Sequence, residues 1–300
     1  MAAPQSPIGS RRRLGAELRR LRNKAHLTLD EVADLMTCST SKISRLETGK
    51  GVPKIPDVRE LMRIYGVTGD TEQDMLLRLV HDGREHGWWE PLTEGVTPDR
   101  FVMDHPARYA SLETEASAVR AFEVAVLHGL VQTPEYARAT LEAFLSERDP
   151  QELDQLVELR IRRQEALNDR DPLLAVFIVI DESTLHRVVG SRELMVEQLQ
   201  YLLELSGRRN IDIRVLPFEV GVHRALNGPF VVLEFPTGVG ADVVYIEGHA
   251  GDAYLETPSD VDLYKGVFAD VTRRALNPDA SRGLISRWLS IHASPKGSPQ

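Results

Sequence analysis

The chain has 300 residues, 42% of them hydrophobic, and a formal net charge of −9 at pH 7. This length predicts one to three domains, with ample apolar material for a buried core. No uninterrupted apolar run reaches the roughly 18 residues of a membrane-spanning helix, so the sequence predicts a cytoplasmic protein without a membrane partner. The single cysteine, Cys38, excludes an internal disulfide and is compatible with a reducing compartment, although a redox switch is a second interpretation of it.

Charge is unevenly distributed along the chain. Residues 1–66 hold 13 Lys or Arg and 7 Asp or Glu, a net charge of +6. The remaining residues hold 23 basic and 38 acidic side chains, a net charge of −15. A basic N-terminal region attracts phosphate, whereas an acidic body is repelled by it. The sequence therefore predicts nucleic-acid contact at the N-terminal end.

The first predicted helix starts near Ser10, after residues 1–9, which are expected to form a disordered tail. Leucines recur along one face of this helix at helical spacing, and basic residues occupy the other face. The leucines are Leu14, Leu18 and Leu21, and the basic residues are Arg12, Arg19, Arg20 and Lys24.

Two short helical patterns follow, joined by a tight break. The first begins at Thr28, whose hydroxyl caps the helix while Glu31, three residues on, reaches back to it. The break falls at Thr37, and Ser39 then caps a second helix that Gly49 ends as a left-handed terminator. This second helix buries its apolar residues and leaves hydroxyls and cations on an open face, which is typical of a helix-turn-helix. A helical hairpin packed for stability alone explains the apolar residues but not the open face.

Several residues of this region carry a family resemblance, namely Leu18-xx-Leu21-Arg22, Leu27-Thr28, Val32-Ala33, Ser41-Lys42-Ile43-Ser44 and Leu46-Glu47-Thr48-Gly49-Lys50. In this pattern the chain resembles the Xre class of DNA-binding domains, which includes the phage Cro and lambda-type repressors. The chain departs from the class at Thr37, where glycine is common. Because a β-branched residue is disfavoured at positive φ, the turn is expected to be strained or bent differently.

The resemblance implies which side chains contact double-stranded DNA. Base edges in the major groove are read from the start of the second helix, and the expected readers are Thr40, Ser41 and Arg45. Phosphate contacts position the domain without specifying sequence, and they are expected from Ser39, Lys42, Thr48, Lys50 and Arg22. The class also implies a structural ion pair between Arg22 and Glu47. For each polar side chain, simple solvation is the alternative.

A fourth helix from Val58 and a fifth helix capped at Thr71 complete an all-α helix-turn-helix head of about five helices over residues 10–85. Residues 107–293 are expected to form an α+β, or mixed α/β, domain with a small sheet flanked by helices. The chain is therefore predicted to be multidomain. Residues 294–300 are expected to form a second disordered tail.

The head and the second domain are joined by a predicted connector, residues 86–106. Its adjacent tryptophans, Trp88 and Trp89, are expected to anchor the connector against a neighbouring domain. An exposed platform on which a ligand stacks is the alternative interpretation.

The second domain is expected to begin with one long helical pattern, residues 112–127. Later strands are expected because apolar runs rich in β-branched residues recur between turn signals. The expected strands are residues 173–180, 211–216, 230–235 and 243–247, and the expected helices start at Thr133-Pro134, Glu152, Glu182, Arg192, Thr257-Pro258 and Asn277-Pro278.

Landmarks along nearly the whole chain carry a second resemblance: Gly87-Trp88-Trp89, Leu112-Glu113-xx-Ala116, Gly129-Leu130-Val131-Gln132-Thr133, Tyr136-Ala137-Arg138-Ala139, Arg160-xx-Arg163-Gln164, Asp181-Glu182, Val215-Leu216-Pro217-Phe218 and Val244-Tyr245-Ile246-Glu247. Their order resembles actinobacterial regulators of the WhiJ or Scr1 type, which join an Xre-like head to a C-terminal domain. His128-Gly129 stands where relatives are expected to have proline-glycine. The resemblance implies a transcriptional regulator, often encoded beside a small partner protein in an antitoxin-like arrangement.

A possible ligand or partner site is predicted from Arg160, Arg163 and Gln164, which share one helix face, together with Trp88 and Trp89. Salt bridges from these arginines to Glu182 or Glu247 are the favoured alternative. We find no nucleophile elbow, phosphate-binding loop, dinucleotide fingerprint or metal-ligand spacing, so we expect no enzyme, no cofactor and no metal site. His223 near Glu219 leaves a hydrolase as a second interpretation.

Together these observations predict a sequence-specific DNA-binding transcriptional regulator. It is expected to bind operator DNA as a homodimer, because one head buries little DNA surface, and its C-terminal domain is expected to sense a ligand or a partner. The alternative is an antitoxin-like protein whose main role is to bind a small partner protein encoded nearby.

Overall fold

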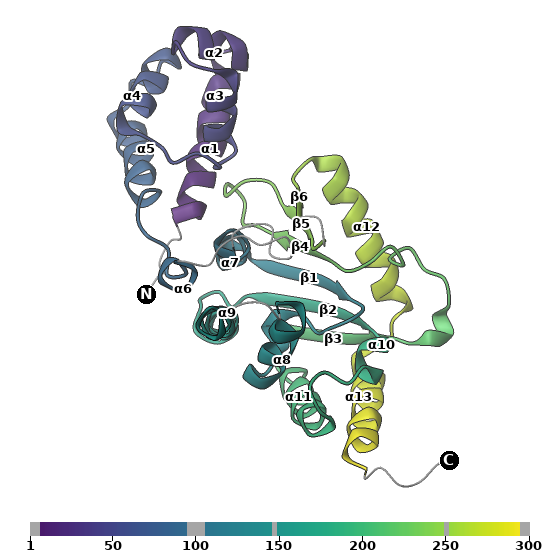
Figure 1. Cartoon of the computed structure of the whole chain (residues 1–300). Coiled ribbons are helices and arrows are strands. Elements are labelled where there is room, and N and C mark those ends of the chain that lie inside the picture. The colour runs from purple at the N-terminus through teal and green to yellow at the C-terminus, as the bar shows by residue number, and fades with distance from the viewer. Residues whose placement is uncertain (1–6, 95–105, 146–148, 249–251, 295–300) are drawn as a thin grey trace. The chain divides into compact units, whose positions relative to one another are not determined.

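The computed structural model describes residues 7–94, 106–145, 149–248 and 252–294. The chain divides into two compact units, one of residues 1–90 with 235–241 and one of residues 91–234 with 242–300. The regular structure described in the first unit is helical, and the second unit holds a sheet flanked by helices (Figure 1). The predicted fold class is thus confirmed. Residues 1–6 and 295–300 of the predicted tails, and 95–105 of the predicted connector, lie outside the described residues.

The first unit contains the helices expected for the head. They are α1 (Pro7–Lys24), α2 (Leu29–Leu35), α3 (Thr40–Glu47), α4 (Ile55–Ile64) and α5 (Asp70–Asp82). The described part of the first helix starts at Pro7, so residues 7–9 of the predicted tail are helical. The predicted Thr71 cap is wrong, since the helix is capped at Gly69 and Thr71 lies inside its first turn.

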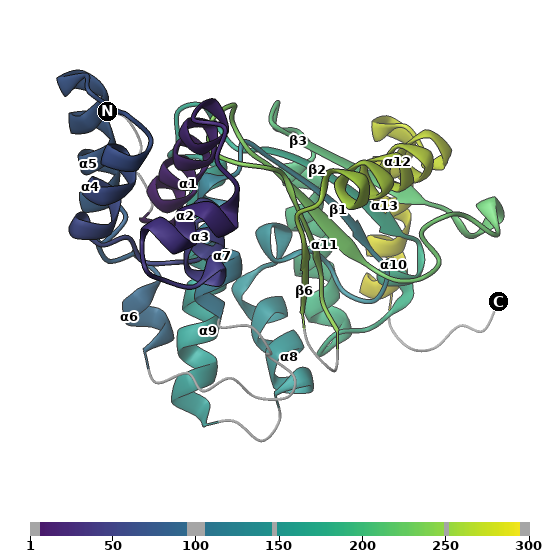
Figure 2. The same ribbon diagram turned by 90° about the horizontal axis from the view of Figure 1, so that it is seen from above.

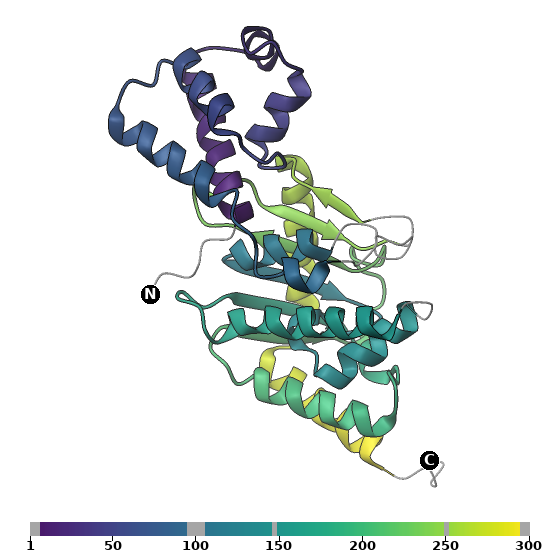
Figure 3. The same ribbon diagram turned by 60° about the vertical axis from the view of Figure 1, so that its left-hand side comes forward.

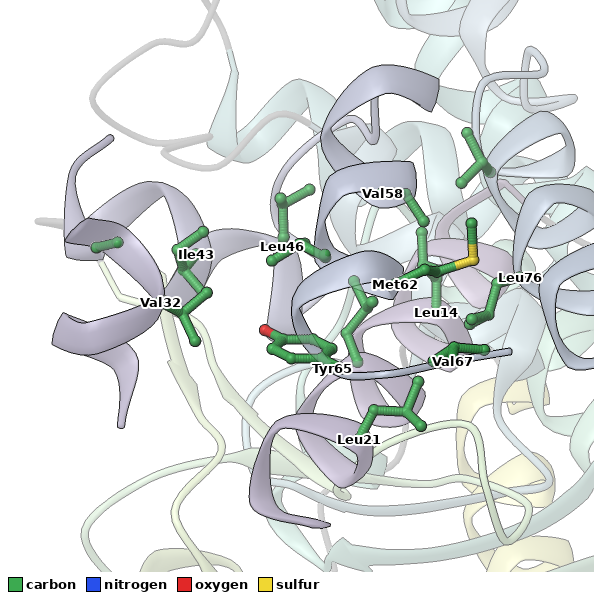
Figure 4. Packing of buried hydrophobic residues seen from close by; sticks show 14 residues of the cluster. Leu14, Leu21, Val32, Ile43, Leu46, Val58, Met62, Tyr65, Val67 and Leu76 are labelled. Carbon is green, nitrogen blue, oxygen red and sulfur yellow. The ribbon is translucent and has the colours of Figure 1, made fainter. Parts of the chain in front are cut away.

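A single apolar core holds these helices together (Figure 4). Leu18 of α1, Val32 of α2 and Ile43 of α3 are fully buried, and Val32 and Ile43 lie side by side where α2 meets α3. Burying each such side chain contributes about 1.5–3 kcal/mol. This core fixes the angle at which α3 leaves α2.

Helices α1 and α3 approach each other closely at Gly15. A Cβ atom on Gly15 would lie 2.6 Å from the carbonyl oxygens of both Leu46 and Glu47, nearer than real Cβ contacts allow. Glycine at this position therefore lets α1 pass directly beside the C-terminal turn of α3. The inner side of α3 is thereby fixed by backbone contact.

The second unit is built on one six-stranded sheet in the order β3-β2-β1-β4-β5-β6. The strands β1 to β3 are parallel, and β4 to β6 continue the sheet in antiparallel pairs. Their bounds are β1 (Ala118–Glu123), β2 (Ala175–Asp181), β3 (Ile211–Leu216), β4 (Phe230–Glu234), β5 (Val243–Ile246) and β6 (Ala253–Leu255).

The long helix predicted for residues 112–127 is wrong. Helix α7 (Pro106–Glu115) covers only the first four residues of that range, and β1 occupies Ala118–Glu123 in the middle of the sheet. A central strand is buried on both faces, so its apolar run lacks the alternation that distinguishes a strand from a buried helix. The three-residue edge strand β6 was not predicted either, because it is too short to carry a periodic signal.

Helices cover both faces of the sheet. Helix α12 (Pro258–Arg274) packs on one face through Val261, Phe268 and Val271. The three views agree that α8 (Pro134–Phe144) and α9 (Pro150–Arg163) lie on the other face (Figures 1, 2 and 3). The remaining helices of this unit are α10 (Ser183–His186), α11 (Arg192–Leu205) and α13 (Pro278–Ala293), with 3-10 turns η1 (Gly129–Val131), η2 (Gln164–Leu167) and η3 (Phe218–Val220).

Several helix starts agree with the sequence. The side chains of Thr133, Thr257 and Asn277 each accept a hydrogen bond from the backbone N–H three residues on, and proline follows each of them. These caps are local, so they could be predicted without knowledge of the fold. A short helix, α6 (Glu90–Thr93), spans the boundary between the two units. None of the helices in the described ranges is long and apolar enough to cross a membrane.

Candidate nucleic-acid interface

The pair α2 and α3 begins with the predicted capping box. The Thr28 hydroxyl accepts a hydrogen bond from the Glu31 N–H at 3.2 Å, and the Thr28 N–H donates to Glu31 Oε2 at 2.8 Å. The hydrogen bonds from Thr28 also lower the pKa of Glu31. Helix α2 is therefore held at its start by two reciprocal bonds, which fixes where the turn to α3 falls.

The turn between α2 and α3 is strained in the way that the sequence suggested. Thr37 has a φ of 50°, in the left-handed region that a β-branched residue disfavours. The Cys38 N–H donates to the carbonyl of Ala33 at 2.9 Å, so the chain closes the end of α2 despite that cost. Ser39 then caps α3 by accepting from the Lys42 N–H at 3.3 Å.

The outer face of α3 carries the predicted base-contacting residues. Ser41 and Arg45 are exposed and lie four residues apart, one above the other on the same helix face. Within the described part of the chain, no hydrogen bond or ion pair engages the hydroxyl of Ser41 or the guanidinium of Arg45. Both side chains therefore keep their hydrogen-bonding groups available for an outside partner.

Thr40, the third predicted base-contacting residue, is placed differently. It is half-buried, and its hydroxyl donates to Asp30 Oδ1 of α2 at 2.7 Å. Its proton is thus directed toward the protein and not toward solvent. The structure therefore brings Ser41 and Arg45 together on an open surface and ties Thr40 to the neighbouring helix.

The predicted phosphate-contacting residues differ in their exposure and in their contacts within the unit. Lys50 and Ser39 are exposed at the two ends of α3. The Thr48 hydroxyl donates to the Ser44 carbonyl at 2.8 Å, within its own helix. The Lys42 ammonium lies 2.9 Å from Asp57 Oδ2, in the first turn of α4.

Arg22 is a structural residue in this geometry. Its Nε donates to Glu47 Oε1 at 2.7 Å, one terminal nitrogen donates to Glu47 Oε2 at 3.0 Å, and the other donates to the Leu27 carbonyl at 2.8 Å. Its side chain is 12% exposed. All three nitrogens are engaged inside the unit, so the geometry does not favour the phosphate contact predicted for Arg22.

The Arg22–Glu47 pair lies at the base of α3. The Glu47 side chain is 2% exposed, and Arg19 approaches it with 3.5 Å between Nε and Oε2. Burial, together with the negative charge of Glu47, raises the pKa of Tyr65 on the adjoining end of α4. The structure thus brings Arg22 and Glu47 together, as the Xre resemblance implied, and locks α3 to α1.

The predicted ligand or partner residues in the second unit are engaged with one another. Arg163 makes a bidentate pair with Glu113 of α7, at 2.6 and 2.9 Å. Gln164 donates to the carbonyls of Gly129 and Gln132, at 2.9 and 2.8 Å. Arg160 donates to Gln132 Oε1 at 3.0 Å. The helix face therefore fastens the loop after β1 to α9, which is an internal role.

The ion pair of Arg163 has a partner that the sequence did not suggest. Arg163 pairs with Glu113, whereas Glu182 accepts from the Phe218 N–H and contacts His186. Burial and the neighbouring Arg163 lower the pKa of Arg160 to about 10, and the charge of Glu247 opposes that shift. Glu113 was missed because residues 112–127 were expected to form one continuous helix.

Trp88 and Trp89 lie in the first unit, whereas Arg160, Arg163 and Gln164 lie in the second. The two indoles meet edge to face, with ring centroids 5.8 Å apart. Trp89 is 3% exposed, and it packs against Gly87 so closely that a Cβ atom there would lie 2.3 Å from the indole. The burial of Trp89 argues against an exposed stacking platform at that residue.

A buried histidine in the loop after β1 gives the second unit a pH dependence. The Leu130 N–H donates to His128 Nδ1 at 3.3 Å, so Nε2 carries the ring proton next to the Tyr109 hydroxyl, 3.1 Å away. Burial lowers the pKa of His128 to about 4. The unfolded chain, with an ordinary pKa of about 6.5, binds the proton first as pH falls. The stability of the second unit is therefore expected to fall by up to about 1.4 kcal/mol per pH unit between pH 6.5 and 4.

The measurement is the urea midpoint of the second unit at several pH values, for the parent and for His128→Asn. Asparagine keeps an acceptor for the Leu130 N–H but does not titrate, so its curve is expected to be flatter by the amount that His128 contributes. Glu123, whose pKa is raised by burial and by Glu247, titrates in both proteins and cancels. His186→Asn, at an exposed site in the same unit, is the control. Parallel curves for the parent and His128→Asn would contradict the prediction.

Comparison with known families supports this arrangement. Residues 13–75 match the family described as a helix-turn-helix domain, and residues 106–287, more than half of the chain, match the family described as a domain of unknown function (DUF5753). Neither the curated proteins nor the solved structures contain a match to this chain. The helix-turn-helix match supports a DNA-binding regulator. The chain belongs to the DUF5753 family, and in it that domain follows an N-terminal helix-turn-helix domain.

Proposed function

We propose that this protein is an Xre-type, sequence-specific regulator that reads operator DNA with α3. The observation that carries the proposal is the open face of α3, on which Ser41 and Arg45 are exposed while Gly15 and the Arg22–Glu47 pair hold the inner face. A rigid helix with available donors on one side is suited to entering a major groove. Arginine can donate to both acceptors of a guanine, which makes Arg45 the main proposed reader.

We further propose that the protein binds DNA as a dimer and that its second unit binds a signal. One α3 helix covers a single half-site, and two heads on half-sites about one helical turn apart would supply the affinity that one head lacks. The second unit is proposed to dimerise and to bind a signal, which the WhiJ or Scr1 resemblance suggests is a ligand or a small partner protein. In this proposal it is a binding domain and not an enzyme, and its signal changes operator occupancy through the difference in affinity between two states.

The first test separates base reading from phosphate contact. Arg45→Ala is expected to lose about 1–3 kcal/mol of discrimination, roughly 5- to 150-fold, between a duplex recovered by in vitro selection and a shuffled duplex. Lys50→Ala is expected to weaken both duplexes equally and to reduce the slope of log affinity against log salt by about 0.9. Fluorescence anisotropy titrations on the full chain measure both quantities.

Arg63→Ala is the control for this test, because Arg63 is an exposed arginine on α4 that pairs with Glu60 within its own helix. It is expected to leave discrimination unchanged. Equal losses on both duplexes for Arg45→Ala and Lys50→Ala would refute the assignment of base and phosphate roles. Failure of the parent protein to enrich any duplex would refute the proposed function itself.

A further inference from the structure

The face of α3 that is proposed to meet DNA carries two internal contacts to acidic side chains. The Lys42 ammonium lies 2.9 Å from Asp57 Oδ2, and the Thr40 hydroxyl donates to Asp30 Oδ1 at 2.7 Å. Asp30 lies in the first turn of α2 and Asp57 in the first turn of α4. Two acids from separate helices thus flank the start of α3, each holding one residue of the predicted interface.

Asp57 lies at a position where the helix favours a negative charge. The N-terminal turn of a helix stabilises negative charge, and α4 has no side-chain cap on its free N–H groups. The Asp57 side chain is 20% exposed and that of Lys42 is 42% exposed, so the pair lies at the surface without being fully solvated. Lys42 can leave Asp57 by rotating its flexible stem, whereas Asp57 stays fixed near the start of its helix.

A DNA phosphate that approaches Lys42 has to compete with the Asp57 carboxylate. The ammonium has to exchange a carboxylate for the phosphate, and the released carboxylate then lies within a few ångströms of the DNA backbone. Non-specific binding depends almost entirely on such phosphate contacts, so it gains less from Lys42 than from an unpaired lysine. Specific binding also gains from base contacts such as those proposed for Arg45, but the cost of releasing Lys42 from Asp57 is the same in both cases.

We propose that Asp57 is an affinity-limiting residue, which occupies Lys42 in the free protein and thereby weakens the binding of Lys42 to DNA phosphates. This inference rests on the proposed function, since it assumes that α3 meets DNA. Asp30 has the same relation to Thr40, and its carboxylate holds the hydroxyl that would otherwise face a base edge. The acids act as internal competitors of the DNA.

The test compares Asp57→Asn with Glu60→Gln in the full chain. Both substitutions remove one negative charge from α4, but Glu60 pairs with Arg63 on the same helix and not with α3. Asp57→Asn is expected to bind both a shuffled duplex and a duplex recovered by in vitro selection about two- to fivefold more tightly. Its salt slope is expected to steepen by up to about 0.9, because the contact between an unpaired Lys42 and a phosphate releases a cation condensed on the DNA. Glu60→Gln is expected to change none of these values.

A double substitution separates two effects of Asp57, its competition with phosphate for Lys42 and its direct repulsion of the DNA. In a Lys42→Ala background, Asp57→Asn is expected to gain less affinity than it does in the parent, because no ammonium is left to release. Asp57→Ser, which keeps a residue favoured in a first helical turn, serves if asparagine lowers the melting temperature. Equal gains from Asp57→Asn and Glu60→Gln, or equal gains with and without Lys42, would overturn the inference while leaving DNA binding intact. A parent protein that binds no duplex would refute the proposed function and this inference together.

Discussion

Replacing Glu47 with alanine is expected to lower the free energy of unfolding of the first unit by about 3–5 kcal/mol. The Glu47 side chain is 2% exposed and makes two hydrogen bonds to Arg22, which is itself largely buried. Removing the carboxylate leaves the Arg22 guanidinium buried with the Leu27 carbonyl and without a counter-charge. Because the pair joins α1 to α3, the loss is expected to release α3 first.

The measurement is hydrogen exchange of the full chain, followed by mass spectrometry. In Glu47→Ala, amides of α1 and α3 are expected to exchange faster, by a factor that reflects the lost stability. The control is Glu60→Ala, which breaks the exposed Glu60–Arg63 pair on α4 and is expected to cost less than about 1 kcal/mol. The outcome that would count against the prediction is similar protection of α1 and α3 in the two variants.

The sequence was most informative about the first unit because its signals are local. The Thr28 capping box and the Ser39 cap depend on residues three apart, and both are present in the structure. The positive φ of Thr37 could likewise be anticipated, because the position where α2 turns into α3 is set by the two caps. Order, length and polarity of the helices follow from the same short-range pattern.

Contacts between distant residues could not be predicted in this way. Lys42 and Asp57 are separated by the loop before α4, and no periodicity in the sequence relates one helix surface to the next. The family resemblance implied a different partner for Lys42, a DNA phosphate, and gave no reason to expect a competing carboxylate. Thr40 and Asp30 present the same case. The two acids come within contact distance of α3 only because packing of the core sets the angles between the helices.

Secondary structure in the second unit could also be predicted only in part from the sequence. Strand β1 was expected to be helical, because Ala118–Glu123 is buried on both sides and its alanines suit either conformation. This error also hid the partner of Arg163, since Glu113 was placed in a helix that ran too far. Strand β3 was predicted correctly at Ile211–Leu216, where buried and half-buried residues alternate. Strand β2 was recognised as a continuous apolar run rich in β-branched residues, a signal that the alanines of β1 do not give.

Replacing Glu113 with alanine is expected to destabilise the second unit by about 3–5 kcal/mol. The Glu113 side chain is 2% exposed and accepts two hydrogen bonds from Arg163, whose guanidinium also stacks over the Tyr109 ring at 4.7 Å. Without the carboxylate, Arg163 is a buried cation beside a second one, Arg160. Repulsion between them adds to the cost of the lost pair, because little water is present to screen it.

The change is measured by hydrogen exchange of α7 and α9 in the full chain, with Asp154→Ala as the control. Asp154 pairs with Arg138 at the surface of the same unit, so its loss is expected to cost less than about 1 kcal/mol. Glu113→Gln separates charge from hydrogen bonding, since the amide oxygen still accepts one bond from Arg163. A ranking in which Glu113→Ala costs most, Glu113→Gln less and Asp154→Ala least would show that Arg163 holds α9 to α7 through charge. If a small anion added to Glu113→Ala restored protection, the vacated site would bind anions; if it did not, Arg163 would have a purely internal role.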